Sequence, residues 1–401
     1  MNVIVDLKKI SGSVDIIPSK SVAHRKIIAA ALSGKEIPFV YGSKDIEATE
    51  KCVRSILSGE EKYYCGESGS TLRFLLPLVG ALGREGTFVT EGRLGKRPIN
   101  DLAEVLAKHG MKVRISEEGN IKVTGKLNSG SFDIRGDISS QYISGLLFAL
   151  PLLEGDSTIN ITGKQESVSY IEMTLDVLRQ SGIVVNDFYV KGNQKYLLKD
   201  LTVEGDWSNG AFWLCAGALS KNGLTVRGLN LNSLQGDKEI LNILRNMGAE
   251  VDIKEEGIFV RGNELWGVEV DAADIPDLVP IVSLMATVAK GNTRIYNAGR
   301  LRLKESDRLS ATCKVLNSLG AEVSISDKDE LIIKGKNGLL KGNADPLDSF
   351  NDHRMAMMLS VASMACKGNI KIKRSEAVEK SYPDFYDVAR ALNSSVDYME
   401  D

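Results

Sequence analysis

Two patterns alternate along the 401-residue chain, and this alternation constrains the fold more than any other feature. The first is a helix of small and apolar residues that ends at a glycine and leads into a short β-like run. The second is an amphipathic helix followed by a glycine and two strands of alternating polarity. Six copies of the first and at least four of the second follow one another in order. This regularity predicts repeated supersecondary units.

The first pattern predicts buried helices, because small and apolar residues leave these helices without a polar face. They fall within residues 19–34, 69–86, 139–155, 207–223, 275–291 and 350–368. The helices of the second pattern have apolar residues at i, i+3 and i+4, as in Leu102, Val105 and Leu106, which predicts a layer packed on sheets. The glycine that follows them is Gly110, Gly182, Gly248 or Gly320.

The two ends of the chain complement each other. The last unit has its second helix at 386–392 and no hairpin after it. Residues 1–17 hold two strand-like runs, 3–7 and 14–17, with no helix before them. We therefore predict that the N-terminal strands complete the sixth unit. The chain is expected to form two α/β domains, one of residues 18–206 and a discontinuous one of residues 1–17 plus 207–401.

The starts of the buried helices indicate an anion site. If the central helices of each domain run parallel, their positive ends converge on one face. Two such domains would then enclose a cleft lined by six helix N-termini, and we expect the active site in this interdomain cleft.

Composition narrows the class of protein. A net charge of −3 argues against a nucleic-acid or membrane-surface protein, and the longest apolar runs are too short to span a bilayer. Five scattered cysteines and three histidines give no reason to expect a disulfide framework or a zinc site. Residues 1–17 lack a signal-peptide pattern, so we expect a cytoplasmic protein without a metal.

Cations are concentrated at the predicted helix starts. Each one taken alone is best interpreted as solvated surface. Taken together, in a chain of net charge −3, they favour a small molecule with several negative charges. No Walker pattern and no G-x-G-x-x-G is present, so a nucleotide is not indicated. These cations are Lys20, Arg25, Arg73, Arg93, Lys96, Arg97, Lys304, Arg308, His353, Arg354 and Lys380.

Three carboxylates near these cations are candidates for proton transfer or for structural roles. Asp277 starts an apolar helix, so it is either a helix cap or a catalytic acid or base. Because asparagine caps a helix about as well as aspartate, Asp277→Asn is expected to cost little stability. Glu305 lies between Lys304 and Arg308, which also suits a surface ion network. Asp352 also suits an N-cap role.

Motifs spread over nearly the whole chain resemble the enolpyruvylshikimate-phosphate synthase family. That family's fold has two domains, each of three βαβαββ repeats with central parallel helices, in an inside-out α/β barrel-like arrangement. The motifs, in family order, are Pro18-Ser19-Lys20-Ser21 with Arg25, Gly69-Ser70-Thr71-Leu72-Arg73, Lys96-Arg97-Pro98, Ser139-Ser140-Gln141, Pro276-Asp277, Lys304-Glu305-Ser306-Asp307-Arg308, Asn351-Asp352-His353-Arg354-Met355-Ala356 and Lys380-Ser381-Tyr382-Pro383-Asp384.

The resemblance implies that an enolpyruvyl group passes from phosphoenolpyruvate to the 5-hydroxyl of shikimate 3-phosphate, in aromatic amino acid biosynthesis. It implies that Asp277, Glu305 and Lys20 take part in catalysis. Shikimate 3-phosphate would be bound by Lys20, Ser21, Arg25, Ser139, Ser140, Gln141, Ser167, Tyr170, Asp277 and Lys304. Phosphoenolpyruvate would be bound by Lys20, Gly69, Arg97, Gln141, Arg308, Arg354 and Lys380. No cofactor and no metal is implied, and a monomer is expected.

Two positions depart from the family pattern. Arg300 stands where many relatives have asparagine, which leaves that phosphate-side contact open. The loop Glu67-Ser68-Gly69-Ser70 replaces Asn-Ala-Gly-Thr, so the response to glyphosate is not predicted.

Two alternatives remain. The sister family that acts on UDP-N-acetylglucosamine carries a cysteine in the loop matching 91–98, where this chain has none, and asparagine where this chain has Ser21. A non-catalytic anion-binding or scaffold protein is the other, and an assay of turnover separates it from an enzyme.

Overall fold

The computed structural model describes residues 1–37 and 42–399. Within it the chain forms two compact units. Met1–Ser19 and Glu204–Asp401 make up the first, and Lys20–Val203 makes up the second. The sequence placed the boundaries at 17/18 and 206/207.

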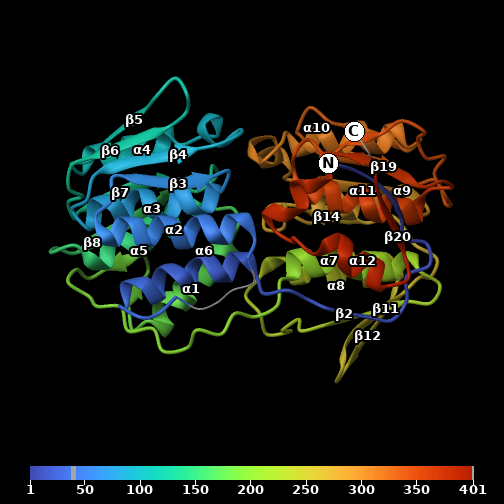
Figure 1. Ribbon diagram of the computed structural model, residues 1–401, viewed down its shortest axis with the longest axis horizontal. Coiled ribbons are helices and arrows are strands. Elements are labelled where there is room, and N and C mark those ends of the chain that lie inside the picture. The colour runs from blue at the N-terminus through green and yellow to red at the C-terminus, as the bar shows by residue number, and fades with distance from the viewer. Residues whose placement is uncertain (38–41, 400–401) are drawn as a thin grey trace. The chain divides into compact units, whose positions relative to one another are not determined.

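The second unit alternates helices and strands along the chain (Figure 1). Its helices are α1 Lys20–Leu32, α2 Lys44–Ser58, α3 Gly69–Ala81, α4 Asn100–Lys108, α5 Ser140–Ala149 and α6 Val168–Gln180, with 3₁₀ turns η1 Leu94–Lys96 and η2 Leu150–Leu152. Its strands are β3 Lys62–Gly66, β4 Gly86–Thr90, β5 Lys112–Ile115, β6 Ile121–Thr124, β7 Ser131–Arg135, β8 Ser157–Thr162, β9 Val185–Asn186 and β10 Tyr189–Val190.

Two four-stranded sheets of this unit repeat one topology. Their strand orders are β3-β4-β6-β5 and β7-β8-β10-β9. In each sheet the first two strands pair in parallel around a central helix, and the later two form an antiparallel hairpin. The predicted βαβαββ unit is therefore present twice here. The β-like run expected after Gly34 falls mainly on 38–41, outside the described residues.

The first unit has three sheets of four strands among the described residues. Its helices are α7 Trp207–Leu219, α8 Ile240–Asn246, α9 Val279–Val288, α10 Arg308–Ser318, α11 His353–Ala365 and α12 Phe385–Ala391, with 3₁₀ turns η3 Gly236–Glu239, η4 Gly299–Leu303 and η5 Ser375–Lys380. Its strands are β1 Asn2–Asp6, β2 Ser13–Asp15, β11 Leu224–Arg227, β12 Glu250–Lys254, β13 Gly257–Arg261, β14 Glu269–Asp271, β15 Asn292–Tyr296, β16 Glu322–Ile325, β17 Leu331–Lys334, β18 Leu347–Asp348, β19 Ile370–Lys373 and β20 Ser395–Met399.

The N-terminal strands only partly follow the prediction. Strand β1 completes the last repeat as expected, because it lies between β19 and β20 in the order β18-β19-β1-β20. Strand β2 does not belong there and pairs in parallel with β11 of the fourth repeat. This pairing continues at Ile16, whose N–H donates to the Arg227 carbonyl at 3.1 Å. The segment therefore follows β11 until the chain leaves the unit.

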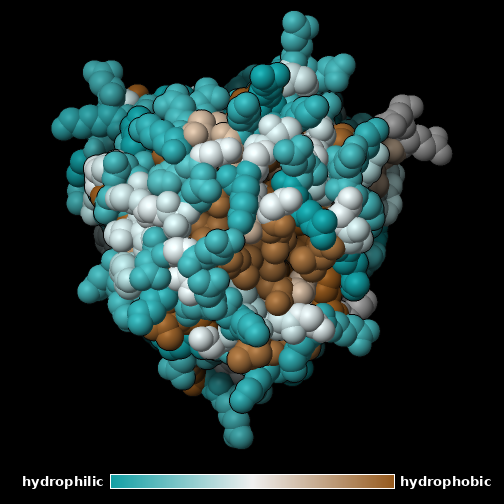
Figure 2. All heavy atoms as spheres, turned by 90° about the vertical axis from the view of Figure 1, so that its left-hand side faces the viewer, coloured by the Kyte–Doolittle hydropathy of each residue, from teal (hydrophilic) through white to brown (hydrophobic). Residues whose placement is uncertain are grey.

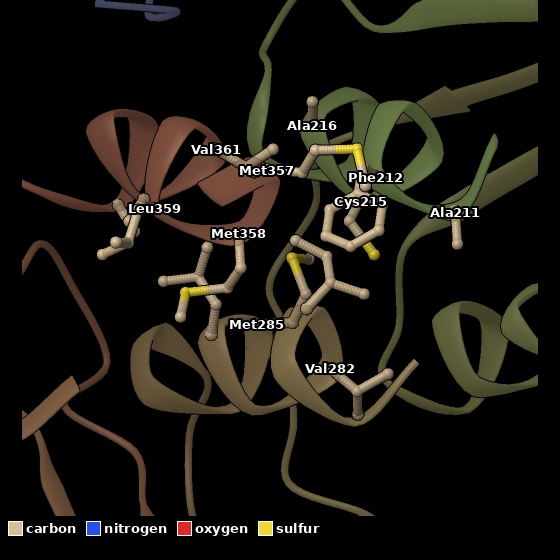
Figure 3. Packing of buried hydrophobic residues seen from close by; sticks show 14 of the residues in the cluster. Ala211, Phe212, Cys215, Ala216, Val282, Met285, Met357, Met358, Leu359 and Val361 are labelled. Atoms are coloured by element: carbon tan, nitrogen blue, oxygen red, sulfur yellow. The ribbon is translucent and has the colours of Figure 1, made fainter. Parts of the chain in front are cut away.

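The core of the first unit lies where α7, α9 and α11 pack on one another. Figure 3 shows Phe212 and Cys215 of α7 meeting Met285 of α9 and Met357 and Met358 of α11. These five side chains are all buried. Unbranched methionine fills irregular gaps between helices, so a methionine-rich seam lets three helices pack without a fixed ridge pattern.

In the second unit the helices α3 and α5 approach closely because of one glycine. A Cβ added at Gly145 of α5 would lie 2.3 Å from the carbonyl oxygen of Arg73 in α3. Any side chain here would separate the two backbones. Small residues in the buried helices therefore set the spacing that brings their N-termini together.

One face of the molecule shows how exposed apolar residues are distributed there (Figure 2). On the face shown in Figure 2, apolar side chains gather in one area and hydrophilic side chains surround it. Single exposed apolar residues such as Leu197, which is 63% exposed, are ordinary in folded proteins.

Replacing Leu7 tests the role of the N-terminal segment in the first core. Leu7 is fully buried, and its N–H donates to Ser363 Oγ of α11 at 2.9 Å. We predict that Leu7→Ala lowers the free energy of unfolding by about 2–5 kcal/mol, because a cavity remains. The exposed Leu197→Ala is the control and should change it by less than about 0.5 kcal/mol. Urea denaturation measures both, and equal midpoints would contradict the prediction.

Candidate active site

In the first unit one carboxylate joins the starts of three helices. Asp277 lies two residues before α9 and accepts hydrogen bonds from Arg308, the first residue of α10, and Arg354, the second of α11. The distances are 2.8 Å from Arg308 Nη1 to Oδ1 and 2.9 Å from Arg354 Nη2 to Oδ2. Both arginines are buried. The structure thus brings the three predicted residues together, although Arg308 is 31 residues and Arg354 is 77 residues from Asp277 in the chain.

Two further carboxylates bind Arg308. Asp352 accepts from Arg308 Nε at 3.0 Å, and Glu305 accepts from Nη2 at 2.9 Å. Asp352 also caps α11, because its side chain accepts from the Arg354 N–H at 2.9 Å. The N-cap interpretation of Asp352 is correct but incomplete, since the same carboxylate holds a buried cation. Glu305 belongs to this network and not to a surface one.

The helix-cap interpretation of Asp277 is wrong. Helix α9 has Leu278 at its N-cap position and no side-chain capping bond. The carboxylate of Asp277 is instead bound by two buried guanidinium groups. Asparagine at 277 would therefore cost stability, contrary to the expectation for a simple cap.

This arrangement shifts the pKa values of its members. Burial alone would raise the pKa of Asp277, but Arg354 and Arg308 hold it well below its ordinary value. Burial lowers the pKa of Lys304 to about 8, although its ammonium group lies 4.0 Å from Asp277 Oδ1. Asp277 is therefore an anion at neutral pH. The pKa of Lys304, about 8, is close to neutral pH.

Asn209 extends the network to α7 and was missed by the sequence reasoning. Its side-chain oxygen accepts from Arg354 Nη1 at 2.8 Å, and its amide nitrogen lies 3.2 Å from Ser381 Oγ. Lys380, next to Ser381, donates to the carbonyl oxygen of Asn351 at 2.7 Å. The available signal was a buried polar residue in the first turn of an otherwise apolar helix.

In the second unit, Lys20 and Arg25 anchor the start of α1. Lys20 is the first residue of α1, and its Nζ lies 2.8 Å from Asp45 Oδ2. Arg25 is buried and donates through Nε to Thr174 Oγ1 at 2.8 Å and through Nη2 to the Tyr170 carbonyl at 2.7 Å. The predicted residues Lys20, Arg25 and Tyr170 therefore lie on two elements, α1 and α6, that pack together.

The starts of α3 and α5 meet in the same unit. Gln141 accepts from Arg73 Nη1 at 2.9 Å and donates to Ser70 Oγ at 2.9 Å. Gly69 opens α3, and a Cβ added there would lie 2.8 Å from Nη1 of both Arg73 and Arg97. Two guanidinium groups thus converge on the position that Gly69 leaves open.

The remaining predicted residues also lie at helix starts of this unit. Ser139 is the N-cap of α5 and accepts from the Gln141 N–H at 3.3 Å, and Ser140 is the first residue of α5. Ser21 is the second residue of α1. Ser167 precedes α6 with φ 54° and ψ 48°, a left-handed conformation that is costly for a residue with a Cβ. Such strain is found most often at ligand sites.

Each of the two units thus carries a cluster of cations at the starts of its buried helices, and helix N-termini are places where proteins commonly bind anions. Within residues 1–37 and 42–399, no three or more His, Cys, Asp or Glu side chains are placed to hold a metal ion. No helix in the described part of the chain is both long and apolar enough to cross a membrane.

Two solved structures have the same fold over nearly the whole chain. EPSP synthase from Acinetobacter baumannii matches with a TM-score of 0.77 at 23% identity over 99% of both chains. The enolpyruvyl transferase NikO from Streptomyces tendae matches with a TM-score of 0.76 at 17% identity over 99% of this chain and 98% of NikO. These likenesses confirm the predicted two-domain α/β fold class.

The sequence comparisons are more specific. The family model described as EPSP synthase (3-phosphoshikimate 1-carboxyvinyltransferase) matches residues 34–389. The 3-phosphoshikimate 1-carboxyvinyltransferase of Clostridium kluyveri is 44% identical over 97% of this chain and 96% of its own length. That of Clostridium acetobutylicum is 42% identical over 96% of both. The chain belongs to the EPSP synthase family, as the motifs indicated.

A further buried carboxyl, Asp237 of η3, was also missed. It is 2% exposed and accepts a hydrogen bond from Ser208 Oγ, and its Oδ1 has no hydrogen-bond partner among the described residues. Burial, with the charge of Asp277, raises the pKa of Asp237 to about 7. Its sequence signal is weak, because aspartate in a turn is ordinarily solvated.

The raised pKa of Asp237 gives the protein a pH-dependent stability. Between about pH 4 and pH 7 the folded state keeps a proton that the unfolded state has lost, so stability falls as pH rises, by at most about 1.4 kcal/mol per unit. We predict that Asp237→Asn flattens this slope. Urea denaturation between pH 4.5 and 7.5 measures it, with the exposed Asp327→Asn as control. An unchanged slope would contradict the prediction.

Proposed function

We propose that this protein is an enolpyruvyl transferase that joins phosphoenolpyruvate to the 5-hydroxyl of shikimate 3-phosphate and releases phosphate, in aromatic amino acid biosynthesis. Membership of the EPSP synthase family and full-length relatives of that activity support the proposal. The single observation that carries it is the Asp277 carboxylate held by two buried arginines beside Lys304 and Glu305.

The proposed reaction is an addition followed by an elimination. The 5-hydroxyl oxygen bonds to C2 of phosphoenolpyruvate, its proton goes to a base, and C3 gains a proton. The tetrahedral intermediate then loses a proton from C3 and its phosphate group, so the enol ether forms. Both steps need charge stabilisation, which arginine and lysine side chains supply, and proton transfer by groups that touch the substrate.

Both clusters have a proposed role in binding. Phosphoenolpyruvate would bind Arg308, Arg354 and Lys380 in the first unit and Lys20, Gly69, Arg97 and Gln141 in the second. Shikimate 3-phosphate would bind Asp277 and Lys304 in the first unit and Lys20, Ser21, Arg25, Ser139, Ser140, Gln141, Ser167 and Tyr170 in the second. That both clusters meet in an interdomain cleft, that the protein is a monomer and that it is cytoplasmic stay predictions.

The low pKa of Asp277 makes it a weak base before substrate binds. An anionic substrate that draws Arg354 and Arg308 toward itself would weaken their hold on the carboxylate, and the pKa of Asp277 would rise. Asp277 would then become a stronger base once phosphoenolpyruvate is bound. Glu305 accepts from Nη2 of Arg308, and Asp277 accepts from Nη1 of the same residue. A proton gained by one of these carboxylates therefore alters the charge that the other experiences.

Replacement of Asp277 by asparagine separates binding from proton transfer. We predict that Asp277→Asn lowers kcat by about 10²–10⁴-fold, because the amide cannot take a proton. The free energy of unfolding should also fall by about 3–5 kcal/mol, because the buried Arg354 loses the carboxylate of Asp277 and keeps the neutral side chain of Asn209. Steady-state kinetics at saturating substrate measure kcat, and urea denaturation measures the free energy of unfolding.

The control for this variant is Asp329→Asn. Asp329 pairs with the half-exposed Arg302 at 2.7 Å and has φ 57°, which asparagine accepts. It should cost less than about 1 kcal/mol and leave kcat unchanged. If folded Asp277→Asn turns over within about threefold of the unmodified enzyme, Glu305 or Lys20 carries the proton instead.

Gly69 tests the proposed phosphoenolpyruvate contacts. A methyl group at 69 would displace the guanidinium ends of Arg73 and Arg97, which lie 2.8 Å from its position. We predict that Gly69→Ala weakens binding of phosphoenolpyruvate and of glyphosate by at least about tenfold and of shikimate 3-phosphate by less than about threefold. Gly368→Ala, where a Cβ meets open space, is the control. Equal losses for all three ligands would indicate misfolding.

A further inference from the structure

The chain passes between its two units twice, and the two passages lie side by side within the first unit. The unit boundaries are 19/20 and 203/204. Immediately beside them, the Ser19 N–H donates to the Glu204 carbonyl at 2.7 Å, and the Asp206 N–H donates to the Ile17 carbonyl at 2.9 Å. We call residues 17–19 and 204–206 the crossing segments. Two backbone bonds alone would hold them only weakly.

The side chain of Gln235, just before η3, binds both crossing segments. Its Oε1 accepts from Ser19 Oγ at 3.0 Å and from the Trp207 N–H at 3.0 Å. Its Nε2 donates to the Gly205 carbonyl at 2.8 Å and to Glu204 Oε1 at 2.9 Å. The side chain is buried at 3% exposure. All four hydrogen-bonding positions of a primary amide are therefore in use.

The orientation of this amide is determined by its neighbours. The Trp207 N–H can only donate and the Gly205 carbonyl can only accept, so a flipped amide would lose both bonds. The second oxygen of the Glu204 carboxylate is also bound, because Oε2 accepts from Asn230 Nδ2 at 2.9 Å. A buried amide with four fixed partners is costly to disturb, because each partner would lose its own bond.

We propose that Gln235 is a positioning residue that clamps both crossing segments to the first turn of α7. The clamp makes residues 17–19 and 204–206 part of one rigid body with α7. Any movement between the two units then has its pivots at the links 19–20 and 203–204. Lys20, the proposed catalytic lysine, is the residue that directly follows the first pivot.

The clamp matters for the reaction because it limits how one unit can move about the other. With loose crossing segments, the chain would bend at several positions and Lys20 would be placed less reproducibly. Residues that control such pivots usually change kcat and KM together. The inference about catalysis rests on the proposed function, whereas the clamp itself does not.

Two variants test the clamp itself by hydrogen exchange. Gln235→Met keeps the volume and removes all four bonds. Gln235→Glu keeps the two acceptor bonds but loses both donors and places a carboxylate against Glu204. We expect amide exchange in peptides covering 16–20 and 204–208 to accelerate by about tenfold or more in both variants, with the rest of the chain unchanged. Unchanged exchange in these peptides would overturn the proposal.

Kinetics test whether the clamp serves the reaction. We expect kcat/KM to fall by about tenfold to a hundredfold, with kcat lowered and KM raised together. In Gln235→Glu the defect should shrink as pH falls, because a protonated carboxyl regains one donor. The control is Gln194→Ala, which removes three hydrogen bonds of a side-chain amide in a loop of the other unit. It should keep kcat and KM within about twofold.

The outcomes separate the two proposals. If the unmodified protein does not turn over shikimate 3-phosphate with phosphoenolpyruvate, the proposed function fails, while exchange still decides on the clamp. If exchange accelerates but kcat and KM stay within about twofold of the unmodified enzyme, Gln235 is a structural residue only and the positioning role is overturned.

Discussion

The first unit depends on the burial of two arginines that share one carboxylate. A buried guanidinium group is costly unless its N–H groups find partners, and removing one partner of a buried ion pair costs about 3–5 kcal/mol. Asp277 between Arg308 and Arg354 therefore ties the starts of α9, α10 and α11 to one another. Such pairs add little net stability compared with apolar residues, so stability alone does not explain why they are buried here.

The two units treat their buried cations differently. In the first, Arg308 is surrounded by Asp277, Asp352 and Glu305. In the second, Arg25 donates to a threonine hydroxyl and to two carbonyl oxygens, all neutral, and its burial lowers its pKa to about 10. Neutral partners leave the positive charge uncompensated. Under the proposed function, an incoming anion would be attracted by the uncompensated charge of Arg25 and would compete with the carboxylates that bind Arg308.

Local pattern was enough to predict much of this protein. Period, glycine position and small residues identified the buried helices, and motif order identified the family. Partner choice was harder, because it depends on contacts between distant parts of the chain. Asn209 meets Arg354 across 145 residues, and a polar residue in the first turn of an apolar helix does not indicate which distant partner it has. The pairing of β2 with β11 was missed for the same reason, since a short strand carries too little pattern to select a sheet.

The position of β1 between β19 and β20 has a consequence for synthesis on the ribosome. The second unit is complete once Val203 has emerged, but β1 has no neighbour until residue 370 has been made. At about 5–20 residues per second, that wait lasts about 20–75 s. Throughout it, Val3 and Val5, which end fully buried, stay exposed on the nascent chain. A segment that is translated before all of its partners is thus among the last to fold.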